Sequence, residues 1–149
     1  MRVGDPAPDF SLRDQDGVER RLADFLARGP VVVFFYPAAS TSGCTRETCH
    51  FRDLAGEFAA HGASRVGISM DSVDKQATFA ENNRLDYPLL ADVGGAVARL
   101  YGVKRPLDLL RVRLTTFVID ASGIVREIIA SELNMNVHAD RALAALSTL

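Results

Sequence analysis

The chain has 149 residues, of which 48% are hydrophobic and 24% are charged, and its formal net charge is -2. This composition excludes an intrinsically disordered chain, and the length predicts a single domain over residues 1–149. The 17 basic residues face 19 acidic ones without a Lys/Arg block, which argues against a nucleic-acid partner. The longest apolar run, residues 31–39, is too short for a membrane helix of about 20 residues. The N-terminus has no hydrophobic region of signal-peptide type, so we expect a cytoplasmic protein without a membrane partner.

The N-terminal quarter of the chain predicts a hairpin, a helical turn and a buried strand. Residues 10–12 and 18–21 have strand character, and the Asp-Gly pair at 16–17 is typical of a hairpin turn. Residues 22–26 predict a short helical turn. Residues 31–36 are continuously β-branched and aromatic, which predicts a strand that is buried on both faces.

The rest of the chain alternates helix and strand signals. A loop of small residues at 38–43 precedes a helical pattern that runs to about residue 62, and residues 104–112 show no regular pattern. The other predicted elements are a strand over 65–70, a helix over 74–83, a strand over 87–91, a helix over 95–101, strands over 115–119 and 124–130, and a helix over 139–149. This alternation predicts an α/β domain with a sheet and helical crossovers.

The chain contains two cysteines, Cys44 and Cys49. A disulfide scaffold normally uses more cysteines, and cytosolic thiols are kept reduced. A structural zinc site would need two further ligands, and no Cys-x-x-Cys pair of thioredoxin type is present. Two interpretations remain at this point: two inert core thiols, or a reactive pair.

Cys44 follows the buried strand and stands near the start of the predicted helix. A helix N-terminus has free N–H groups and a partial positive charge, so it stabilises an anion. We therefore expect a lowered pKa for Cys44 and a larger fraction of the nucleophilic thiolate. Thr41 and Ser42 offer hydroxyls, either as helix caps or as donors to the sulfur. The plainer interpretation is that Cys44 is a small buried hydrophobic residue and Thr41 only a cap.

Helical spacing separates the two cysteines. At about 100° per residue, Cys44 lies on the apolar stripe that contains Phe51 and Phe58. Cys49 is displaced by about 140° around the axis and about 7.5 Å along it, on the side of Arg52. A disulfide needs Cα atoms roughly 4.4–6.8 Å apart, so the two thiols can join only if the helix unwinds locally.

The segment around Cys44 resembles a known signature. Pro37, Thr41 and Cys44 match the Pro-x-x-x-Thr-x-x-Cys motif of the peroxiredoxins, and Glu47 and Cys49 extend the match toward the Q-type subfamily, also called bacterioferritin comigratory protein. Further segments with the same resemblance are residues 4–10, 51–53, 67–69 and 116–120. The resemblance implies a thioredoxin-like fold, with a central mixed sheet flanked by helices.

The resemblance also implies a function and roles for individual residues. The function is thiol-dependent reduction of hydrogen peroxide and organic hydroperoxides, without a metal, flavin or haem cofactor. Cys44 matches the peroxidatic cysteine, Cys49 the resolving cysteine, Pro37 the residue that shields the pocket, and Thr41 the hydroxyl that hydrogen-bonds the peroxide and the thiolate. The Cys44–Cys49 disulfide would be reduced by thioredoxin or a similar thiol donor, and the subfamily is often monomeric. Two alternatives are a one-cysteine peroxidase with an external resolving thiol and a non-enzymatic thioredoxin-like interaction module.

The chain departs from the family pattern at two positions. Ser42 replaces the usual Pro before Gly-Cys, which frees the backbone φ angle of the loop. Leu114 stands where the family places its active-site Arg, and Arg113 precedes it. Neighbouring strand residues face opposite sides, so Arg113 reaches the pocket only if a bulge re-aims it; otherwise it is a solvated charge.

Three other polar residues near the cysteines have simpler interpretations. We expect Glu47 in the first helical turn, where an acid is stabilising, although a direct catalytic role stays open. His50 is expected to be a surface imidazole, and His138 to precede the last helix. His50 also occupies the position at which a cysteine phosphatase would need its Arg, which excludes that class of enzyme.

Overall fold

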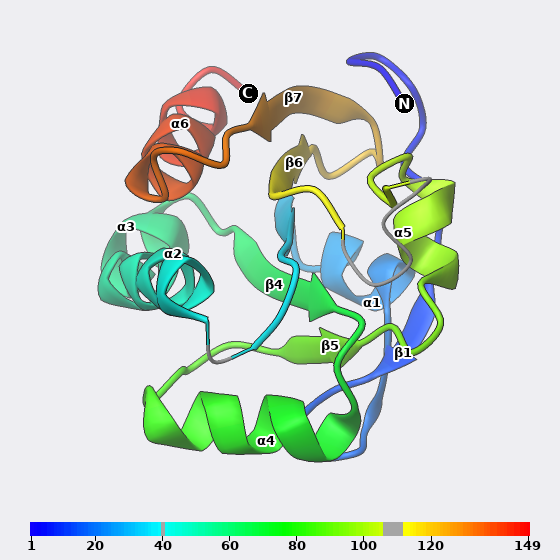
Figure 1. The fold of residues 1–149 in the computed structure, drawn as a ribbon. Helices are drawn as coiled ribbons and strands as arrows, with labels where there is room; N and C mark the ends of the chain where they lie inside the picture. Colours follow the sequence, from blue (N-terminus) through cyan, green and yellow to red (C-terminus); the bar gives the residue numbers. More distant parts are fainter. Residues whose placement is uncertain (40, 106–111) are drawn as a thin grey trace.

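A mixed β-sheet forms the centre of the molecule in the computed structural model, which describes residues 1–39, 41–105 and 112–149 (Figure 1). The sheet has seven strands in the order β2-β1-β5-β4-β3-β6-β7. Their bounds are β1 Ser11–Arg13, β2 Glu19–Arg21, β3 Val31–Phe35, β4 Ser64–Ser69, β5 Leu89–Ala91, β6 Thr115–Ile119 and β7 Val125–Ala130. β4 lies between β3 and β5 and is parallel to both, whereas β6 lies antiparallel to β3 on the other side of β3.

Helices cover both faces of this sheet. Their bounds are α1 Leu22–Leu26, α2 Ser42–Asp53, α3 Ala55–Ala60, α4 Val73–Asn82, α5 Ala96–Leu100 and α6 Asn136–Leu146. α1 and α5 contribute to one hydrophobic cluster, together with Val31, Val33 and Phe35 of β3. α2, α3, α4 and α6 contribute to the other cluster, with Val32 and Phe34 of β3. Successive β3 side chains therefore point to opposite cores, which explains why this strand is apolar at every position.

The structure confirms the predicted central mixed sheet flanked by helices, and it corrects two helix boundaries. The single helix predicted up to residue 62 is two helices, because Leu54 adopts φ -97° and ψ 21° and both ends α2 and begins α3. The last helix begins at Asn136, three residues before the predicted start, and therefore includes His138. In the irregular segment, Lys104 and Val112 form an isolated bridge, and residues 106–111 lie outside the described residues.

No helix in the described part of the chain is long and apolar enough to cross a membrane.

Candidate active site

Cys44 lies at the beginning of α2, the helix that follows the central strand β3 and its loop. It is the third residue of α2 and its side chain is buried. Phe51 of the same helix stacks on Phe34 of β3, with ring centroids 4.2 Å apart and the rings nearly parallel. This stack fixes the core-facing side of α2 against the sheet. The predicted apolar stripe is confirmed in part: Cys44 and Phe51 of α2 are buried and so is Phe58, but Phe58 belongs to α3, and the stripe's other members, Leu54 and Ala55, are half-buried.

Thr41 occupies the N-cap position of α2 but does not act as a side-chain cap. Its backbone is extended, and its hydroxyl donates to the carbonyl oxygen of Ala38 at 3.1 Å rather than capping the helix. Hydrogen bonds to the Thr41 side chain and to the Ala38 backbone also lower the pKa of Cys44. Of the two roles predicted for Thr41, the structure therefore excludes the side-chain cap, and the hydroxyl proton is directed at the Ala38 carbonyl.

The pKa of Cys44 is raised, not lowered as the sequence predicts. Burial is the largest cause, because it disfavours the charged thiolate. The hydrogen bonds from Thr41 and the Ala38 backbone lower the pKa, whereas the carboxylates of Glu47 and Asp71 raise it further. The helix N-terminus was expected to dominate, but the depth of burial could not be known from the sequence.

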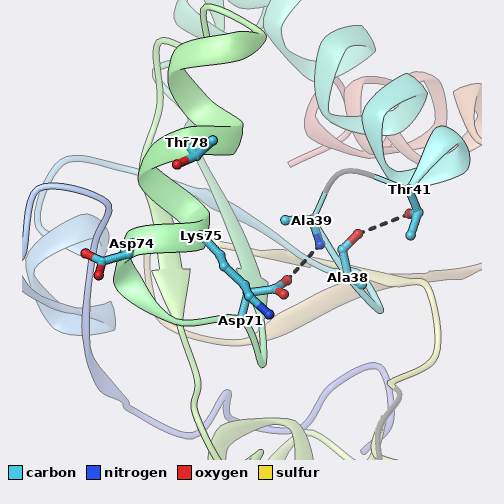
Figure 2. Close-up of a pocket in the computed structure, with 7 residues that line it drawn as sticks. All are labelled: Ala38, Ala39, Thr41, Asp71, Asp74, Lys75 and Thr78. Carbon is cyan, nitrogen blue, oxygen red and sulfur yellow. Dashed lines mark hydrogen bonds between the residues drawn. The ribbon is translucent and has the colours of Figure 1, made fainter.

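A pocket of about 570 Å³ opens beside the loop between β3 and α2 (Figure 2). Its lining residues come from this loop and from the beginning of α4 and the turn before it: Ala38, Ala39, Thr41, Asp71, Asp74, Lys75 and Thr78. Ala38 and Thr41, which affect the pKa of Cys44, thus also line the pocket, whereas Cys44 is not among its lining residues. A small molecule in the pocket would therefore lie next to the loop that leads to Cys44. Pro37, half-buried, begins the same loop.

Cys49 lies in the same helix and is partly buried; both cysteines are free thiols. The Cys49 thiol donates to Oδ1 of Asn83 at 3.6 Å. Because both cysteines lie within the intact α2, their sulfurs cannot bond without unwinding of this helix, as the spacing predicts.

Arg113 lies in a different depression from Thr41. Its exposed side chain lines a pocket of about 280 Å³ together with Arg105, Ser131 and Glu132. Among the described residues, the two pockets share no lining residue. The neighbouring Leu114 is buried in the core. In this conformation the structure does not bring Arg113 together with the cysteine loop.

Glu47 is a feature of the site that the sequence interpretation placed wrongly. It is the sixth residue of α2, not part of the first turn, and its side chain is fully buried. Neither carboxylate oxygen has a hydrogen-bond partner among the described residues, and burial raises its pKa well above the usual value. The signal was present in the sequence: Glu47 is three residues after Cys44 and four before Phe51, so it shares their core-facing side.

His138 lies opposite Glu47 and is also buried, contrary to the prediction that it precedes the last helix. Its Nε2 donates to the carbonyl oxygen of Ser131 at 2.7 Å, so Nδ1 accepts from the hydroxyl of Thr116 at 2.8 Å. Burial lowers the pKa of His138. A neutral ring with both nitrogens occupied does not neutralise Glu47, whose Oε2 lies 3.8 Å from Nε2.

His50, predicted as a surface imidazole, lies in the last turn of α2 and contacts α6. Its Nε2 lies 2.7 Å from a carboxylate oxygen of Asp140, and a quarter of its side chain is exposed. This contact holds α2 against α6 from the outside of the site.

Comparisons with known proteins place this arrangement in a family. A sequence profile of the AhpC/TSA family matches residues 3–128. The chain is a peroxiredoxin of the AhpC/TSA family. The crystal structure of the peroxidoxin BcpB from Mycobacterium tuberculosis is 58% identical and superposes with a TM-score of 0.96, over 100% of this chain and 98% of that one. The chloroplastic peroxiredoxin Q of Populus jackii is 38% identical over 149 residues, which is 100% of this chain and 70% of the relative.

A bacterioferritin comigratory protein from Xanthomonas campestris provides a more distant structural relative. It is 30% identical, with a TM-score of 0.84 over 93% of this chain and 90% of that one. These similarities confirm the predicted thioredoxin-like fold and the predicted resemblance to the Q-type peroxiredoxins. The chain is accordingly a thiol peroxidase, which excludes the alternative of a non-enzymatic interaction module.

Proposed function

We propose that Cys44 is the residue that this peroxiredoxin uses to reduce hydrogen peroxide and organic hydroperoxides. The observation that carries the proposal is the position of Cys44 as the third residue of α2, directly after the loop whose residues Ala38 and Thr41 line the pocket. The thiolate attacks one peroxide oxygen as the O–O bond breaks. The departing oxygen takes the electron pair and a proton to become water or an alcohol, and Cys44 becomes a sulfenic acid. The Xanthomonas relative, described for its alkyl peroxide reduction activity, supports the inclusion of organic hydroperoxides.

Three further residues have proposed roles in this step. The Thr41 hydroxyl hydrogen-bonds the sulfur and the peroxide, and Pro37 shields the pocket at the start of the loop. Arg113 stabilises the charge that develops on the departing oxygen. Because Arg113 now lines a separate depression, this role requires its segment to shift toward the loop.

We propose that Cys49 resolves the sulfenic acid. Its sulfur attacks the sulfur of Cys44, a disulfide forms, and the hydroxyl leaves as water. α2 must unwind for this step, which breaks the contacts that hold its second half. In these contacts, the Tyr87 hydroxyl donates to the carbonyl oxygen of Thr48 at 2.7 Å, and Arg65 donates to the carbonyl oxygen of Phe51 at 2.9 Å. Arg52 donates to the carbonyl oxygen of Asn83 at 2.6 Å, and the Cys49 thiol donates to the side chain of Asn83. Thioredoxin or a similar dithiol then reduces the disulfide by exchange.

Intact-protein mass spectrometry after one equivalent of hydrogen peroxide tests both steps. We expect the wild type to lose two hydrogens and the Cys49→Ser variant to gain one oxygen. A gain of one oxygen in the wild type would instead support a one-cysteine peroxidase with an external resolving thiol. Cys44→Ser should abolish turnover with any reductant, and turnover within tenfold of wild type would reject Cys44 as the nucleophile.

We further propose that the protein acts as a single-domain monomer in the cytoplasm, without nucleic-acid or membrane partners. Its nearly balanced charge and its two free thiols support this proposal. Size-exclusion chromatography with light scattering, on the reduced and on the oxidised protein, measures the oligomeric state directly.

A further inference from the structure

A chain of buried hydrogen bonds runs from the end of β3 toward the pocket. The hydroxyl of Tyr36 donates to Oε1 of Gln76 at 2.5 Å, and Nε2 of Gln76 donates to the hydroxyl oxygen of Ser69 at 2.9 Å. The Ser69 hydroxyl donates in turn to Oδ2 of Asp71 at 2.7 Å. Tyr36, Gln76 and Ser69 are almost completely buried, whereas Asp71 is half-buried and lines the pocket. Asp71 is therefore held in place from the interior.

The same carboxylate oxygen also holds the cysteine loop. Oδ2 of Asp71 accepts from the backbone N–H of Ala39 at 2.7 Å, which joins the turn before α4 to the loop before α2 (Figure 2). The carbonyl oxygen of Ala38, the preceding residue, accepts from the hydroxyl of Thr41, and hydrogen bonds to the Ala38 backbone and the Thr41 side chain lower the pKa of Cys44. Asp71 thus fixes the peptide next to these groups. A hydrogen bond to an ionised carboxylate is roughly twice as strong as a neutral one.

The charge of Asp71 works against the reaction. A carboxylate near Cys44 raises the pKa of the thiol, so it reduces the fraction of thiolate. A carboxylate at this position is therefore disadvantageous unless its geometric effect outweighs its electrostatic one. Removal of the Asp71 side chain should slow the reaction through the lost loop geometry, whereas removal of its charge should increase the fraction of thiolate. Because these two changes are opposite, the two effects can be separated.

We propose that Asp71 is a positioning residue for peroxide reduction: by binding the N–H of Ala39, it holds Ala38 and Thr41 in the arrangement that directs them at the Cys44 sulfur. This inference rests on the proposed role of Cys44. It makes no use of the second cysteine, and it assigns Asp71 no contact with the peroxide.

Asp24 provides a control for the test. It carries the same charge, but it is an exposed residue of α1 outside the pocket, and its side chain makes no hydrogen bond among the described residues. Asp71→Asn keeps an oxygen that can accept from Ala39 and removes the charge. Asp71→Ala removes both.

The experiment measures Cys44 in a Cys49→Ser background, where it is the sole thiol. Thiolate absorbance against pH gives the pKa, and stopped-flow oxidation by hydrogen peroxide gives the rate constant on the high-pH plateau. We expect Asp71→Asn to lower the thiol pKa and to keep the plateau rate within about threefold. Asp71→Ala should lower the pKa as well, but reduce the plateau rate by about tenfold or more, as the loss of a charge-assisted hydrogen bond implies. Asp24→Ala should leave the plateau rate unchanged.

A plateau rate in Asp71→Ala equal to that of the background would overturn the proposal, and so would an equal loss in Asp71→Asn. Should Asp71→Ala fail to fold, amide exchange at Ala39 replaces it. That N–H must be protected in the wild type and in Asp71→Asn, and free exchange in the wild type rejects the proposal. Cys44→Ser separates the two ideas: residual turnover there removes the proposed function itself, whereas an inactive Cys44→Ser beside a normal Asp71→Ala removes this inference alone.

Discussion

Replacing Glu47 by Gln should stabilise α2, by an amount that grows with pH. In the folded helix the Glu47 carboxyl is fully buried without a hydrogen-bond partner among the described residues, and burial raises its pKa well above the usual range. When α2 unwinds, water reaches this carboxyl and its pKa returns to about 4.3. The folded helix therefore binds the proton more tightly than the unwound one.

The sign and size of the effect follow from this difference in proton binding. The contribution of Glu47 protonation to the free energy of unfolding is fully present below the unfolded pKa of about 4.3. This contribution is lost as the pH rises through the folded pKa. Between those two values the loss is about 1.4 kcal/mol for each pH unit. Glutamine has nearly the same shape but does not titrate, so this slope is absent from Glu47→Gln.

Three other titratable groups interact with this part of α2. His138 faces Glu47 from α6, and Cys44 and Tyr87 interact with its charge. The lowered pKa of His138 gives the opposite slope, because its contribution is lost as the pH falls through the folded pKa. The same His138 is present in both proteins, so its contribution largely cancels in the difference between Glu47→Gln and wild type.

Urea unfolding and amide exchange of α2, measured between pH 5 and pH 7.5 on the reduced protein, provide the assay. Glu57→Gln is the control, because Glu57 is an exposed glutamate in the first turn of α3. We expect the stability difference between Glu47→Gln and wild type to increase steadily with pH, and the difference for Glu57→Gln to stay flat. A difference for Glu47→Gln that does not change with pH would refute the reasoning. Slower disulfide formation in Glu47→Gln at pH 7 should accompany the stabilised helix.

Three further predictions concern the redox cycle. Arg113→Ala should slow sulfenic acid formation about a hundredfold if its segment shifts toward the loop; stopped-flow rates equal to wild type would leave Arg113 as a surface charge. Peroxide treatment should relax amide-exchange protection over residues 44–56 in the wild type but not in Cys49→Ser; equal protection in reduced and treated wild type would exclude an intramolecular disulfide. Tyr87→Phe leaves the Thr48 carbonyl without its 2.7 Å donor, which should destabilise α2 by about 1–3 kcal/mol and speed disulfide formation; an unchanged rate in quenched-flow thiol trapping would show that this contact does not restrain the helix.

The sequence predicted the elements whose signals are local. The apolar run of β3 and the five-residue α1 match their predicted positions closely, because chain composition and turn residues determine both. The break at Leu54 was missed, since neither a proline nor a strained glycine marks it. The start of α6 was missed because its first residues, 136–138, do not show the helical spacing of apolar side chains.

The site divides in the same way. The position of Cys44 at a helix start and the separation of Cys49 follow from spacing within one element, and both were predicted. The raised pKa of Cys44 depends on how deeply α2 packs, and the bond between Asp71 and Ala39 joins two loops 32 residues apart. Such pairings are set by the sheet order, which spacing within one element does not reveal. Glu47 is the exception, because its spacing from Cys44 already placed it on the buried side.

If Cys49 resolves the sulfenic acid as proposed, the break at Leu54 sets a limit on how far the chain must rearrange in each catalytic turnover. Leu54 closes α2 and opens α3, so unwinding that begins at Ser42 meets a natural end after twelve residues. Beyond it, Phe58 of α3 stays buried in the core and anchors the far side. A helix of this size forms again in about 0.1–1 μs, far faster than an encounter with a reductant. Refolding of α2 would then never limit turnover, and the speed of the cycle would be set by the thiol chemistry at either end of it.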